Sequence, residues 1–119
     1  MTTRLQRSIS DYARSVAGWR RQRFDDPHQD RRNLRSAEGL EEFAGYVLDL
    51  PEDDPRLLIL RELASYDDDF TPGQQVTWEF ARFRFYHEHS TCDAFITHLA
   101  ELAQSDSTEH GHFGGRMAP

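Results

Sequence analysis

The chain has 119 residues and a single cysteine, which indicates one domain and excludes a disulfide within the chain. All fourteen basic residues are arginine, so chemistry that depends on a lysine amine, such as Schiff-base formation, is excluded. No apolar run is long enough to span a membrane and no secretion signal is recognisable, so we expect a cytoplasmic protein. The lack of lysine also indicates the compositional bias of a GC-rich bacterial genome.

The net charge of −7 is unevenly distributed. Residues 1–35 carry nine arginines and four acidic residues, whereas residues 36–119 carry five arginines and seventeen acidic residues. The simplest interpretation is that the basic segment packs against the acidic body of its own chain or of a second copy. The alternative is an arginine-mediated contact with nucleic acid, for which the acidic body is unfavourable.

The first predicted helix covers residues 3–24, with Thr2 or Thr3 as its N-cap and Asp26-Pro27 after its end. Its apolar residues recur at helical spacing and predict a core-facing stripe: Leu5, Ile9, Tyr12, Val16 and Trp19. The polar stretch 25–35, which contains Pro27, is predicted to be a linker. A second amphipathic helix is predicted from about Ser36 to the residues before Pro51.

Three further helices follow. Asp54-Pro55 is a strong start signal, and the four aliphatic residues at 57–60 predict a third helix at the centre of the fold. The segment TPGQ at 71–74 predicts a capping box with Thr71 as N-cap, opening a fourth helix that runs to about His89. The segment STCD at 90–93 predicts the start of a fifth helix, which ends near residue 104.

These elements predict an all-α protein, a compact bundle of four to five helices with a disordered C-terminal tail. We expect a single domain over residues 1–104, comprising the basic helix 3–24, the linker 25–35 and an acidic helical body 36–104, followed by a tail at 105–119. A strand over residues 76–89 is the alternative for the fourth helix. It would require an unusually long strand with a phase slip near Ala81, so we prefer the helix.

The fourth helix is the most informative part of the chain because its aromatic residues divide between two opposite faces. One face carries Val76, Phe80, Phe83 and His87, and the other carries Trp78, Arg82, Phe85 and His89. The second face is either buried within the bundle or is an interface, where aromatic residues and arginine are favoured. We therefore predict six partner-binding residues: Trp78, Arg82, Phe85, His89 and, from the basic segment, Arg20 and Arg21.

A second candidate is a transition-metal site formed by His87, His89, Cys92 and His98. The spacing is unfavourable, because two residues that are two positions apart point in nearly opposite directions on a helix. A nucleophilic role for Cys92 would require a lowered pKa of its thiol and a nearby base. We assign no catalytic residue and predict no cofactor.

The leading hypothesis is a small cytosolic, non-enzymatic interaction or accessory protein that self-associates or binds a protein partner through residues 76–89. A small metal- or ligand-binding protein that uses the region His87 to His98 is the alternative. A nucleic-acid-associated subunit acting through its N-terminal arginines is the third hypothesis.

Overall fold

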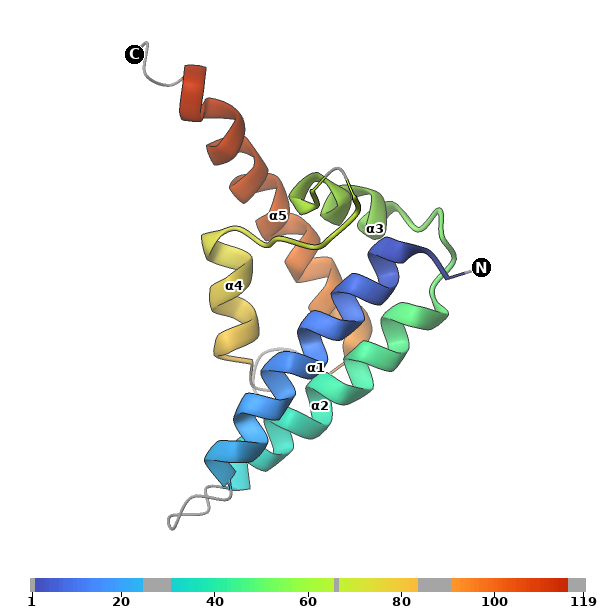
Figure 1. Ribbon diagram of the computed structural model, residues 1–119, viewed down its shortest axis with the longest axis vertical. Helices are drawn as coiled ribbons and strands as arrows, with labels where there is room; N and C mark the ends of the chain where they lie inside the picture. Colours follow the sequence, from blue (N-terminus) through green and yellow to red (C-terminus); the bar gives the residue numbers. More distant parts are fainter. Residues whose placement is uncertain (1, 25–30, 66, 84–90, 116–119) are drawn as a thin grey trace.

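The computed structural model describes residues 2–24, 31–65, 67–83 and 91–115, apart from the side chains at 23–24 and 106–115. In this part of the chain every regular element is a helix, which confirms the all-α bundle (Figure 1). No helix among these residues is long and apolar enough to cross a membrane. The elements in chain order are α1 (Arg4–Phe24), α2 (Arg31–Asp49), α3 (Pro55–Leu60), the 3-10 helix η1 (Arg61–Leu63), α4 (Gln74–Ala81) and α5 (Cys92–Gly115).

Helices α1 and α2 lie side by side as an antiparallel hairpin (Figure 1). Each buries small residues completely, Ala13 and Ala17 on α1 and Ala37 and Ala44 on α2, and small side chains allow helices to approach closely. This packing shifts the buried stripe of α1, so the predicted core residue Trp19 is 47% exposed. The prediction that Trp19 belongs to the core stripe is therefore wrong.

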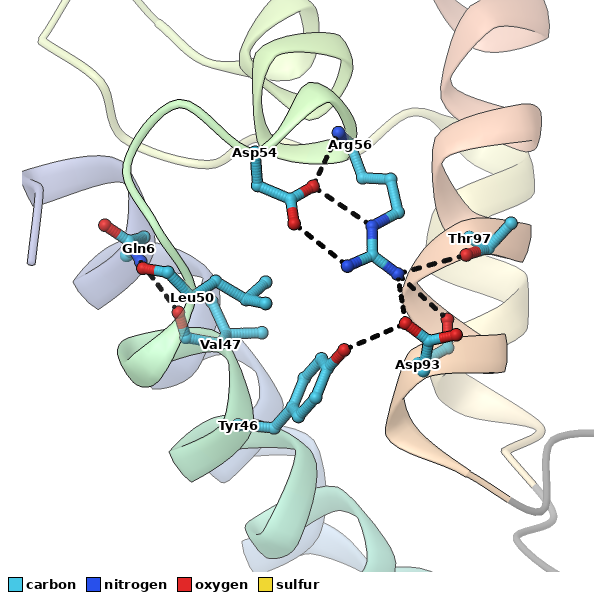
Figure 2. A network of polar contacts seen from close by, with 8 residues as sticks. All are labelled: Gln6, Tyr46, Val47, Leu50, Asp54, Arg56, Asp93 and Thr97. Atoms are coloured by element: carbon cyan, nitrogen blue, oxygen red, sulfur yellow. Dashed lines mark hydrogen bonds and ion pairs between the residues drawn. The ribbon is translucent and has the colours of Figure 1, made fainter.

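A capping box opens α1, as the Thr3 N-cap prediction required. The backbone N–H of Gln6 donates to Thr3 Oγ1 at 3.1 Å, and the backbone N–H of Thr3 donates to Gln6 Oε1 at 2.9 Å. The fully buried Gln6 amide also donates to the carbonyls of Val47 at 2.8 Å and Leu50 at 2.9 Å (Figure 2). The Gln6 side chain thus satisfies backbone hydrogen-bonding groups at both the start of α1 and the end of α2.

Helix α2 begins at Arg31, whereas the sequence pattern placed its start near Ser36 and assigned 25–35 to a linker. The added residues continue along α1, where Arg20 Nη1 donates to Asn33 Oδ1 at 2.8 Å. The contact between Arg20 and Asn33 thus supports helical residues that precede the apolar pattern of α2.

Helix α3 starts as predicted, with the Asp54 carboxylate accepting from the backbone N–H of Arg56 at 2.9 Å and Pro55 at the first position. It is short, and only Leu57 and Leu60 are buried, while Leu58 is exposed. The prediction of a central helix is wrong, because six residues present only one face to the bundle.

Helix α4 begins after Gly73, and the predicted cap Thr71 instead donates its hydroxyl to the carbonyl of Leu63 at 2.7 Å. The helix ends at Ala81, well before the predicted His89, and Phe83 just beyond this end is buried. Distant side chains satisfy the carbonyls freed at this end. The Arg20 guanidinium donates to Ala81 O, and Ser36 Oγ donates to Phe83 O at 2.9 Å.

Helix α5 begins at Cys92, capped by Thr91, whose Oγ1 accepts from the backbone N–H of Ala94 at 3.0 Å. Its helical backbone continues to Gly115, past the end expected near residue 104, and its last turns project beyond the other helices (Figure 1). Among the described side chains, the last buried one is Ala103. Packing of α5 in this part of the chain therefore stops close to the predicted end of the folded domain.

Phe80 on the inner face of α4 lies at the centre of the core. Its ring meets Tyr12, Phe95 and Phe43 edge-on, with centroid separations of 4.8, 5.4 and 6.0 Å. Val76 and Phe80 are fully buried, as predicted for this face. The aromatic contacts join α4 to α1, α2 and α5 and determine which face of α4 points outward.

Candidate functional site

A hollow of about 410 Å³ lies between α4 and α5. Its volume falls within the range of sites that accept a small ligand or the side chains of a partner. The hollow is lined by Gln75, Trp78, Glu79, Arg82, His98 and Leu102.

Trp78 is the most exposed of the large apolar side chains in the described part of the chain, at 61% of its surface. Because Val76 and Phe80 point into the core, the residue midway between them projects from the opposite side of α4. The outward position of Trp78 is thus a direct result of how α4 is anchored.

Glu79 forms the buried polar part of the hollow, with its side chain 6% exposed. Arg82 approaches Glu79 Oε2 with Nε at 2.8 Å and Nη2 at 2.7 Å, and His98 Nε2 lies 3.2 Å from Oε1. A carboxylate so nearly buried requires partners of this kind, since an isolated buried charge is strongly unfavourable. Glu79 therefore orients Arg82, at the end of α4, and His98, on α5.

We define the rim of the hollow as Arg82, which lines it, and Glu101, which lies beside the lining residue His98, so the rim carries charges of both signs. The Arg82 side chain is 57% exposed even though Glu79 orients its guanidinium. On α5, Glu101 is 72% exposed, with Oε1 at 4.0 Å from Nδ1 of His98. A partner would meet an ordered cation on α4 and an accessible carboxylate on α5.

Two of the predicted partner-binding residues, Trp78 and Arg82, line this hollow. Phe85 and His89 lie outside the described residues.

Arg20 and Arg21, which were also predicted to bind a partner, lie near the C-terminal end of α1 and contact other residues of their own chain. Arg20 donates to Asn33 and to the carbonyl of Ala81, and Arg21 pairs with Glu41 through Nε at 2.8 Å and Nη2 at 2.7 Å. These contacts favour the interpretation that the basic segment packs on the chain's own body.

The predicted metal ligands are not brought together in the described part of the chain. His87 and His89 lie outside it, and Cys92 and His98 line different hollows. Within the described residues, no group of three or more His, Cys, Asp or Glu side chains is placed to hold a metal ion.

Cys92 lies beside Tyr46 and Glu42 in a second hollow of about 550 Å³. Burial, assisted by the charge of Glu42, raises the pKa of the Cys92 thiol to about 11. The group is therefore a thiol at neutral pH, which does not support nucleophilic chemistry there.

A separate polar cluster around Arg56 joins α2, α3 and α5 (Figure 2). Arg56 donates from Nε and Nη2 to Asp54 at 3.0 and 2.9 Å, and from Nη1 to Asp93 at 2.6 Å and Thr97 at 3.2 Å. The Tyr46 hydroxyl donates to the same Asp93 oxygen at 3.1 Å. Hydrogen bonds from Arg56 lower the pKa of Asp54 and of Asp93. The cluster therefore ties α2, α3 and α5 to one another.

Sequence reasoning missed Glu79 and its contact with His98. The spacing of Glu79 and Arg82 by three residues is a signal for an ion pair on one helix face. The contact with His98 carries no sequence signal, because it depends on how α4 and α5 pack.

Comparison with known proteins gave no matching family model, no similar curated protein and no similar solved structure.

Proposed function

We propose that this is a small, non-enzymatic interaction or accessory protein of the cytoplasm, which binds another protein chain through the surface between α4 and α5. We call this region the Trp78 surface and define it as Trp78, Arg82, His98, Glu101 and Leu102. The exposure of Trp78, at 61%, is the observation that carries the proposal.

An exposed tryptophan beside an ordered arginine has the composition of a binding hot spot. Tryptophan and arginine are the residues most enriched among those that dominate binding energy. Leu102, half-buried beside them, extends the apolar area. Covering this surface would remove apolar area from water without any rearrangement of the core.

The buried Glu79 favours binding because it orders Arg82 and His98 before a partner arrives. Ordering a long side chain costs free energy on association, and a side chain that is already oriented loses less. Among the described residues, those that line the hollow include no hydroxyl or thiol side chain. The lining therefore suits recognition better than nucleophilic chemistry.

The proposal can be tested with the photo-crosslinking residue benzoylphenylalanine at position 78, in the cells that make the protein. We expect crosslinks to a protein chain from position 78. The matched controls place the same residue at Trp19 and Leu58, which are exposed apolar positions away from the hollow. Equal crosslinking from all three positions, or none from position 78, would contradict the proposal.

A further inference from the structure

We infer that the chain that covers the Trp78 surface is a second copy of this protein, related to the first by a twofold axis. This inference rests on the proposed function and names the partner. It follows from the distribution of charge on the rim of the hollow.

A twofold interface uses the same patch on both copies, so the patch must be complementary to itself. The rim meets this requirement, because Arg82 on α4 and Glu101 on α5 have opposite charges and are both exposed. In a twofold pair, Arg82 of each copy can face Glu101 of the other, which gives two favourable contacts. A partner with charge of one sign would gain at one of these positions and lose at the other.

The apolar part of the surface is consistent with the same arrangement. Trp78 and Leu102 line the hollow together with Arg82, and Leu102 follows Glu101 in the sequence of α5. A twofold axis near Trp78 would bring two indole rings together. Aromatic side chains at the centre and charged side chains at the rim are the usual anatomy of a protein interface.

The chain's two tryptophans allow a direct test. In the Trp19→Phe variant, all tryptophan emission comes from Trp78. We expect this emission to shift to shorter wavelength as protein concentration rises from micromolar to millimolar, in step with dimer formation measured by sedimentation. The Trp78→Phe variant, which retains Trp19, should show no such shift and should dimerise more weakly.

The charged contacts are tested by Glu101→Arg, with Glu52→Arg as the matched control. Both positions are exposed and both substitutions change the net charge equally, but residue 52 lies in the turn between α2 and α3. We expect Glu101→Arg to weaken dimerisation by about tenfold, because each Arg82 would then face a cation. Glu52→Arg should leave dimerisation unchanged or strengthen it, since it reduces repulsion between two acidic chains.

An equal effect of the two charge reversals would overturn the inference, as would a protein that stays monomeric throughout the concentration range. A monomer that still gives position-specific crosslinks from residue 78 would overturn only the identity of the partner. The proposed function would then stand with a different protein on the Trp78 surface.

Discussion

The protein contains two arginine–carboxylate clusters that differ in how far the arginine is covered. In the Arg56 cluster both side chains of the Arg56–Asp54 pair are mostly covered, at 22% and 11% exposed, and Arg56 also bonds to Asp93 and Thr97 on α5. In the Arg82 cluster the carboxylate of Glu79 is on the inside and the guanidinium faces outward. The guanidinium is thus mostly covered in the first cluster and mostly exposed in the second, at 22% and 57%.

We interpret the Arg56 cluster as one that stabilises the fold, and the Arg82 cluster as one that orients a side chain at the surface. A mostly covered arginine such as Arg56 can satisfy several carboxylate and hydroxyl oxygens at once, because its donors form a planar fork. A buried glutamate can instead hold an arginine in one orientation at the surface. We expect substitutions in the first cluster to affect stability and substitutions around the second to affect association.

Between the two clusters, the largest expected effect is that of Arg56→Ala, because the change leaves Asp54 without its guanidinium and removes the hydrogen bonds from α3 to Asp93 and Thr97 on α5. We expect the free energy of unfolding to fall by about 3 kcal/mol, measured by urea denaturation with an unchanged slope. The matched variant Arg82→Ala should cost only about 1 kcal/mol, since His98 still contacts Glu79 and Arg82 is largely in water. An equal loss in both variants would contradict the distinction between the clusters.

An intermediate effect is expected at acid pH. The pKa of Asp54 in the folded state lies below its usual value of 3.8, chiefly because of the hydrogen bond from Arg56. The ionised group therefore adds stability that is fully present above about pH 4 and is lost as the pH falls through the folded-state pKa. Asp54→Asn retains the helix cap and removes the charge.

The wild-type protein should consequently lose more stability than Asp54→Asn between pH 5 and about pH 2, measured by urea denaturation. Parallel pH curves for the two proteins would show that the Asp54–Arg56 pair does not stabilise the fold.

The smallest expected effect on stability is that of Trp78→Ala. The indole is mostly in water, so its removal should change the free energy of unfolding by less than about 0.5 kcal/mol. Phe80→Ala, two residues away, provides the contrast and should cost about 4 kcal/mol, because it empties the centre of the aromatic core. A large loss of stability in Trp78→Ala would place this residue in the fold and not on a binding surface.

Local signals in the sequence were sufficient for the class of the fold and for several helix starts. The caps at Thr3 and Asp54 were predictable because each bonds to a backbone N–H within three residues, and the segment 90–93 predicted the start of α5, although not that Thr91 is its cap. The position of Trp78 opposite Phe80 was also predictable, since it follows from helical geometry alone.

Features that depend on distant contacts were not predictable in this way. At the end of helix α4, Arg20 donates to Ala81 O and Ser36 donates to Phe83 O, and both donors are remote in sequence. The contact of Glu79 with His98 likewise requires α4 and α5 to be packed together. Helix propensity and periodicity contain no information on these contacts.

The position of Phe80 also bears on the order of folding. The α1–α2 hairpin joins neighbouring segments, whereas Phe80 packs on Tyr12 and Phe43, which are far from it in the chain. Because long loops close more slowly, we expect the hairpin to form first and α4 to dock late. Pulse-labelled hydrogen exchange should therefore show protection in α1 and α2 before α4, and simultaneous protection would refute this order. The Trp78 surface would then be completed only after the core has formed, which limits premature association of partly folded chains.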